Sequence, residues 1–132
     1  MNVRLLAAAA ICAASFPTAA LAQAVSAAND PRLNNQRDAF GVSSRQAAHM
    51  CLAAAEKALQ AAGYTGVQVV GLKQIESKAE GYELEAWVSV SGGGPAWRGA
   101  DGDKGGPLRG TVDCEVKRGS IVDLDFDDIP GV

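Results

Sequence analysis

The stretch SSRQAAHMCLAAAEKALQAAG, residues 43–63, decides the fold because it defines one amphipathic helix. Ser43 and Gln46 have the spacing of a helix N-cap, and Gly63 stands where a left-handed C-terminal cap is favoured. Apolar side chains recur at helical spacing and form one stripe: Ala48, Cys51, Leu52, Ala55, Leu59 and Ala62. The sequence therefore predicts a helix whose alanine-rich stripe lies close against a sheet.

After this helix the hydrophobic period changes from 3.6 residues to 2, which indicates strands. A first strand begins at Val67 and Val69, and its alternation slips at Gly71, where a bulge or bend is expected. Residues 82–90 form the clearest strand, with one apolar and one polar face. Its polar face carries Glu83, Glu85, Trp87 and Ser89.

Two further strands are expected near the C-terminus, at 108–116 and 121–126, joined by a tight hairpin at 117–119. Their alternation predicts two sets of inward-facing residues: Val112, Cys114 and Val116 in one strand, and Val122, Leu124 and Phe126 in the other. Asp123, Asp125 and Asp127 are expected to point outward.

The order of elements predicts an α+β fold, in which one N-terminal helix packs on a roughly four-stranded antiparallel meander. Cys51 on the helix stripe and Cys114 at an inward strand position then lie in the same layer. We expect a disulfide between them that ties the helix to the sheet. In the chain-entropy model such a long closed loop contributes roughly 4 kcal/mol of stability.

The first 22 residues have the pattern of a secretory signal peptide, with Arg4 in a short cationic start, an apolar core and a small-residue motif ending at Ala22. The alternative, a transmembrane anchor, is disfavoured by the weakly hydrophobic alanines, by Pro17 and by the lack of a cationic stop-transfer cluster. Cleavage after Ala22 removes Cys12 and leaves two cysteines in an oxidising compartment, where they usually pair. The sequence therefore predicts a periplasmic or secreted protein.

Three segments are expected after the signal peptide. Residues 23–42 have no helical or strand period and are predicted to be a flexible leader. Residues 43–128 form a single domain, interrupted by a mobile glycine-rich loop at 91–107. The net charge of -3 gives the chain no electrostatic reason to bind nucleic acid or an anionic membrane.

A further pattern combines the capped alanine-rich helix and its cysteine with Gly63-Tyr64, Gly81-Tyr82-Glu83-Leu84 and Val112-Asp113-Cys114-Glu115-Val116. Over roughly residues 43–126 it resembles small exported domains of uncharacterised function from Gram-negative bacteria. Its order of elements is also similar to cystatin-like and PepSY-like domains. The resemblance implies an inhibitory or binding role and carries over no catalytic or binding residue.

Several residues could carry chemistry, and each also has a structural interpretation. His49, the single histidine, would have to serve any serine or cysteine nucleophile, yet it is expected on the solvated face of the helix. The distant Cys51 and Cys114 favour a structural bridge over a redox pair. Asp101 and Asp103 begin like a calcium loop but lack its further acidic ligands. The aspartates at 123–128 are typical of the solvent-exposed face of an edge strand.

The two tryptophans, Trp87 and Trp97, are both expected off the main core, and Arg98 follows the second. Together they are candidates for a recognition surface. The alternative is that Trp97 folds back over Trp87, and that the two form a small hydrophobic cluster separate from the main core. We expect a non-catalytic exported binding or accessory domain of the bacterial cell envelope, with no cofactor and with an envelope protein or peptide as its partner. The alternatives are a small calcium-binding module and a small periplasmic hydrolase.

Overall fold

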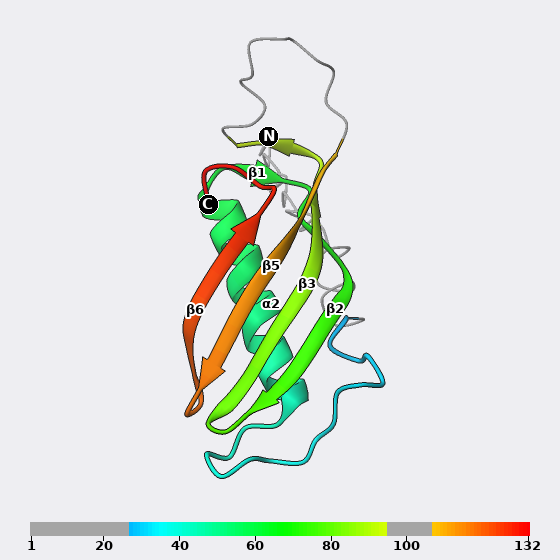
Figure 1. Ribbon diagram of the computed structural model, residues 1–132. Coiled ribbons are helices and arrows are strands. Elements are labelled where there is room, and N and C mark those ends of the chain that lie inside the picture. Colours follow the sequence, from blue (N-terminus) through cyan, green and yellow to red (C-terminus); the bar gives the residue numbers. More distant parts are fainter. Residues whose placement is uncertain (1–26, 95–106) are drawn as a thin grey trace, which may run out of the picture.

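The computed structural model describes residues 27–94 and 107–132 (Figure 1). Its elements, in chain order, are α2 (Ser44–Ala61), β1 (Tyr64–Thr65), β2 (Gln68–Lys78), β3 (Gly81–Val90), β4 (Gly92–Gly93), β5 (Leu108–Lys117) and β6 (Ser120–Asp127). Among these described residues, no helix has both the length and the apolar run needed to cross a bilayer.

Helix α2 begins and ends where its caps predict. The Ser43 hydroxyl accepts a hydrogen bond of 3.1 Å from the backbone N–H of Gln46, which satisfies one of the unpaired amides of the first turn. At the other end, Gly63 has a φ of +91° and donates its N–H to the carbonyl of Gln60. A left-handed residue directly after the last turn is a common way for a helix to end.

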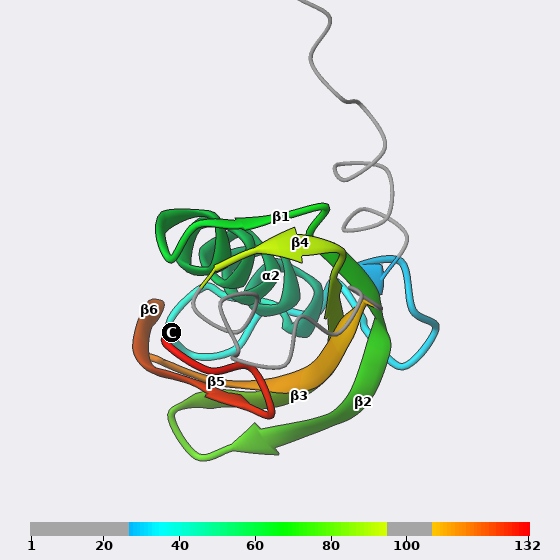
Figure 2. The same ribbon diagram turned by 90° about the horizontal axis from the view of Figure 1, so that it is seen from above.

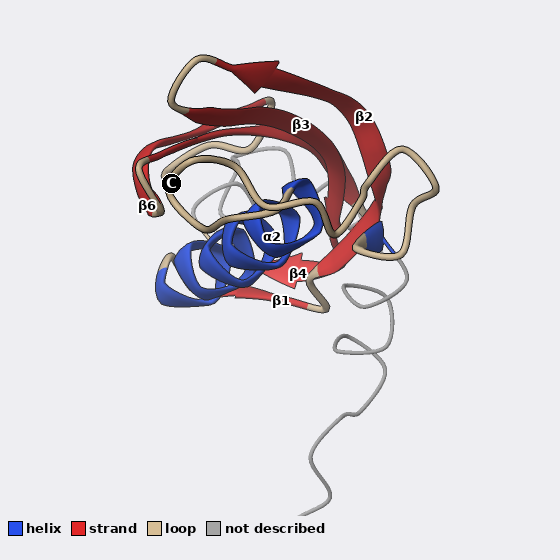
Figure 3. Ribbon diagram, turned by 90° about the horizontal axis from the view of Figure 1, so that it is seen from below, coloured by secondary structure: helices blue, strands red, loops and turns tan. Residues whose placement is uncertain are grey.

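The main sheet is a four-stranded antiparallel meander with the order β2-β3-β5-β6. It lies against one side of α2 and curls around the helix (Figures 1 and 2). Viewed from the other end, α2 lies inside the curve of the sheet (Figure 3). The predicted α+β fold is therefore confirmed.

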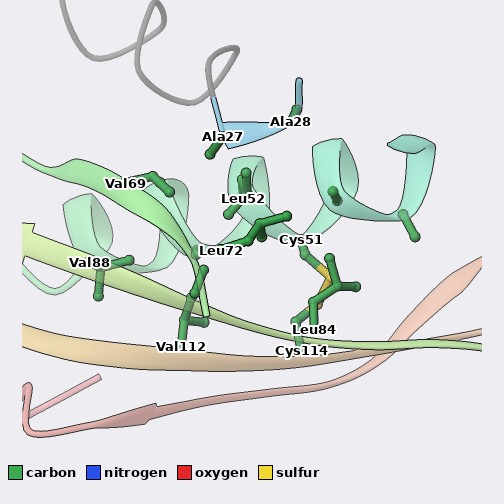
Figure 4. Packing of buried hydrophobic residues seen from close by; sticks show 14 of the residues in the cluster. Ala27, Ala28, Cys51, Leu52, Val69, Leu72, Leu84, Val88, Val112 and Cys114 are labelled. Atoms are coloured by element: carbon green, nitrogen blue, oxygen red, sulfur yellow. A yellow bond between two sulfur atoms is a disulfide. The ribbon is translucent and has the colours of Figure 1, made fainter. Parts of the chain in front are cut away.

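A disulfide joins Cys51 of α2 to Cys114 of β5 across 63 residues of sequence, with 5.9 Å between the two Cα atoms. Both cysteines are buried, and Leu84 lies beside the bridge in the core (Figure 4). The predicted link between helix and sheet is thus confirmed. It holds together the two layers whose apolar faces make up the core.

The segment between β3 and β5 begins differently from the expected loop. Gly92 and Gly93 form β4, which pairs with β1 in a second, two-stranded sheet. Glycine is required here, because a Cβ atom on Gly93 would lie 2.2 Å from the carbonyl oxygen of Gly63. The rest of the predicted mobile loop, residues 95–106, lies outside the described residues.

Residues 27–42, expected to belong to a flexible leader, pack instead between α2 and the outer edge of β2 (Figure 2). Leu33 is 3% exposed and Val42 is also in the core. From α2, the Arg45 side chain donates to the carbonyls of Ala28 and Leu33 at 2.8 and 3.0 Å. These contacts use side chains rather than a repeating backbone pattern, so the segment has no helical or strand period in the sequence.

The prediction that Val122 faces the core is wrong. Val122 is 54% exposed, whereas Leu124 and Phe126 face the core as expected. The cause is a β-bulge: Glu115 pairs with Asp123 and Val116 pairs with Ile121, so Val122 has no partner in β5. A bulge adds a residue and reverses the alternation, and Ile121 therefore takes the inward place. A register shift beside Gly71 in β2 agrees with the bulge expected there.

Candidate binding surface

Trp87 lies on the outer face of the sheet and is 46% exposed. Its neighbours in β3, Ala86 and Val88, are buried against the helix, so the alternation of the strand turns the indole away from the core. The residue paired with Trp87 on β2 is Gly71, which has no side chain to cover the ring. Strand alternation and the glycine opposite therefore both leave the indole exposed on the outer face of the sheet.

Lys73 of β2 occupies part of this surface. Its ammonium nitrogen lies 4.9 Å from the centre of the Trp87 ring and also forms an ion pair with Glu85. An ammonium group over an indole ring is attracted by the negative face of the π system. The indole of Trp87 and the carboxylate of Glu85 thus already share one cation, the ammonium group of Lys73.

Two rows of carboxylates cross the outer face of the sheet, between Trp87 and the turn that joins β2 to β3. Strand pairing places Glu83, Glu115 and Asp123 in one row and Glu85, Asp113 and Asp125 in the next. Lysines neutralise part of them: Lys78 lies 2.9 Å from Glu83, and Lys117 lies 2.7 Å from Glu115. Within the described part of the chain, the β6 aspartates at 123, 125 and 127 have no ion-pair partner.

Asp113 stands in the middle of these rows. Partial burial raises the pKa of its carboxyl group above the usual range, and the nearby charges of Glu85 and Asp127 raise the pKa further. Like charges directly opposite on neighbouring strands destabilise a sheet. The outer face therefore holds more negative charge than its own lysines balance, and it attracts cations.

The other predicted site residues do not gather at this surface. His49 is exposed on α2, and among the described residues it makes no side-chain hydrogen bond or ion pair. Trp97, Arg98, Asp101 and Asp103 lie outside the described residues. Over 27–94 and 107–132, no three acidic, histidine or cysteine side chains converge to hold a metal ion.

Two shallow cavities border the segment 27–42. One of about 520 Å³ lies between residues 27–31 and residues 68–72 of β2. The other, of about 260 Å³, is lined by polar side chains that include Asn34, Asp38 and Lys78. Neither cavity includes His49 or Trp87.

The carboxylate rows and Lys73 are parts of the surface that sequence reasoning missed. Each strand shows its own acidic residues, but the sequence does not show which residues lie opposite one another. That depends on strand register, which the bulges in β2 and β6 alter.

Comparison with protein-family models, with curated proteins and with solved structures finds no match to this chain.

Proposed function

We propose that this chain is an exported, non-catalytic binding domain that holds a cationic protein segment against the outer face of its sheet, at Trp87. The observation that carries the proposal is the exposed indole beside the carboxylate of Glu85, on a strand in the middle of the sheet. Aromatic anchors of this kind dominate many protein interfaces.

Lys73 supports the chemistry of this partner. It shows that an ammonium group at this position satisfies the indole and a carboxylate together. A lysine or arginine of the partner would make the same two contacts after Lys73 has moved aside. Arginine suits the site better, because its planar guanidinium both stacks on a ring and pairs with a carboxylate.

The disulfide and the N-terminal sequence support the part of the proposal that concerns export. The disulfide between Cys51 and Cys114 is of a type that persists in oxidising compartments. Together with the signal-peptide pattern of residues 1–22, it favours a periplasmic or secreted location, where a small stapled domain can act as an accessory to an envelope protein.

The test is a titration with a capped oligoarginine peptide, followed by calorimetry and by tryptophan fluorescence. Trp97→Phe serves as the background, because it leaves Trp87 as the single tryptophan. Trp87→Ala is expected to weaken binding. Lys73→Ala removes the internal competitor and is expected to tighten binding by about fivefold, the equivalent of ~1 kcal/mol for a cation on an exposed ring.

Lys57→Ala is the matched control, because it changes the net charge equally from an exposed position on α2. We expect it to leave the affinity nearly unchanged. Equal tightening by Lys57→Ala and Lys73→Ala would show that only net charge matters. An unchanged affinity in Trp87→Ala would likewise reject the site.

A further inference from the structure

The second feature that points to a partner is the free edge of β6. Among the described strands, β6 has β5 as its one neighbour. The backbone N–H of Leu124 donates to its neighbour's side chain, Asp123 Oδ1, at 3.1 Å, so this amide faces away from β5. In an antiparallel ladder the amide two residues on, that of Phe126, faces the same way.

The two faces of this edge differ in chemistry. Leu124 and Phe126 pair with the buried Cys114 and Val112, so they lie on the helix side and are half-buried. Asp123, Asp125 and Asp127 lie on the outer side and are exposed. An added strand would therefore meet apolar side chains on one face and carboxylates on the other, in strict alternation.

The opposite edge of the sheet shows how this molecule covers a strand. There the side chain of Arg32, in the segment 27–42, donates to the carbonyl oxygens of Leu72 and Lys73 on β2, at 2.6 and 3.1 Å. The same segment accepts hydrogen bonds from Arg45 of α2 at the carbonyls of Ala28 and Leu33, so it links β2 to the helix. In the described part of the chain, β6 has no equivalent cover.

A second copy of the chain is a poor occupant for this edge. If two β6 strands paired with each other, the aspartates of one would meet those of the other, and like charges facing each other across a ladder are destabilising. Lysine or arginine in the added strand would instead pair with the aspartates. Charge complementarity thus selects the partner.

We propose that the free edge of β6 binds an extended segment of a partner protein, in which cationic and apolar residues alternate, as a fifth strand of the sheet. Backbone carbonyl oxygens of this segment would accept hydrogen bonds from the amides of Leu124 and Phe126. At Leu124 the new acceptor would replace Asp123 Oδ1. The apolar residues of the segment would cover the half-buried side chains of β6. The site lies two strands away from Trp87 and does not rest on the function proposed above.

The test compares two capped synthetic peptides of equal composition, one alternating lysine with valine and one with the lysines and valines in separate blocks. We expect the alternating peptide to bind the mature protein at least about tenfold more tightly, because only it offers both faces at once. Hydrogen exchange is expected to slow at the amides of Leu124 and Phe126. Equal binding of the two peptides, or unchanged exchange at both amides, would overturn the proposal.

Two double variants locate the site. Asp123→Asn with Asp125→Asn removes two charges at the edge and keeps an acceptor oxygen beside Leu124. Its matched control, Glu56→Gln with Glu76→Gln, removes two charges from α2 and β2, outside both carboxylate rows. The edge variant is expected to weaken binding of the alternating peptide about tenfold. The control is expected to keep its affinity within about twofold of wild type. An equal loss in both would indicate general attraction to an acidic surface and refute the proposal.

Trp87→Ala separates this proposal from the previous one. Lysines of either peptide can also contact Trp87, so this variant is expected to leave unchanged the preference for the alternating over the block peptide and the slowed exchange at Leu124 and Phe126. If it abolished binding of the alternating peptide while the edge variant did not, the peptide would occupy the Trp87 surface, and the inference about β6 would be wrong while the proposed function stood.

Discussion

At the scale of single residues, the outer face of the sheet places charge where it reduces stability. Asp113 lies between Glu85 and Asp125 of the neighbouring strands, and its pKa is raised by burial and by negative neighbours. A sheet selected for stability alone would have a neutral residue there. Positions at which stability is sacrificed often serve function, and this one adjoins the surface proposed to bind cations.

Asp113→Asn is expected to stabilise the domain by roughly 0.5–1 kcal/mol at pH 7, because it removes a like-charge contact between strands. A carboxyl group with a raised folded-state pKa binds its proton more tightly in the folded state than in the unfolded state. The destabilising charge is therefore present at neutral pH and disappears as the pH falls through the pKa of Asp113. Urea unfolding at several pH values should show the difference between wild type and variant shrinking in acid. A constant difference would contradict this account.

At the scale of elements, the segment 27–42 is held by a few charged side chains. Arg32 links Asp30 to the carbonyls of β2, and its hydrogen bonds lower the pKa of Asp30 to about 2. A carboxyl group with a lowered folded-state pKa stabilises the fold above its unfolded pKa and loses that effect as the pH falls toward 2. The segment should therefore be held fully at neutral pH and loosened in strong acid.

Arg32→Ala is expected to destabilise the domain by about 1 kcal/mol at pH 7 and to speed proteolysis within residues 27–42, because the edge of β2 loses its cover. Arg37→Ala, at an exposed position in the same segment, is the control. Limited proteolysis with mass spectrometry reads out both variants. Equal cleavage rates in the two variants would show that Arg32 does not hold the segment.

The glycines of the second sheet offer a sharper test of an element. Gly93→Ala is expected to cost at least about 1–2 kcal/mol, because the residue has a φ of +72° and a Cβ atom there would meet the carbonyl of Gly63. Gly71→Ala is the control, since no atom lies within 4 Å of a Cβ built there. Thermal melts of the two variants should differ clearly. Similar melting temperatures would argue against the pairing of β1 with β4.

Most elements could be predicted from the sequence, because α2 and the four long strands are decided by local periodicity and by caps. Three features depend on contacts between distant residues and could not be. The placement of Leu33 relies on hydrogen bonds of its segment to α2 and β2. The pairing of β4 relies on β1, and the exposure of Val122 relies on a bulge against β5. Of the candidate site, the exposed face of Trp87 followed from alternation, whereas Lys73 and the carboxylate rows required the register.

At the scale of the whole molecule, the disulfide between Cys51 and Cys114 cross-links the helix layer to the sheet layer. Half of the buried apolar side chains of α2 are alanines, which bury little apolar area each, so hydrophobic burial alone gives a small domain limited stability. Cys51→Ala with Cys114→Ala is expected to cost about 4 kcal/mol, a large share of the roughly 5–15 kcal/mol by which small domains are stable. Urea denaturation of the oxidised wild type, the reduced wild type and the double variant checks this. A midpoint unaffected by reduction would mean that the packing of helix on sheet suffices.

The central claim is an exported domain stapled by Cys51 and Cys114, and the intact mass of the protein recovered from the producing cells tests it most directly. The mass is measured with and without reduction and alkylation. The account predicts a chain that runs from Gln23 to Val132, is lighter by two hydrogen atoms than the reduced chain, and takes up alkylating reagent only after reduction. A chain that retains residues 1–22 and reacts with the reagent before reduction would contradict both the export and the staple.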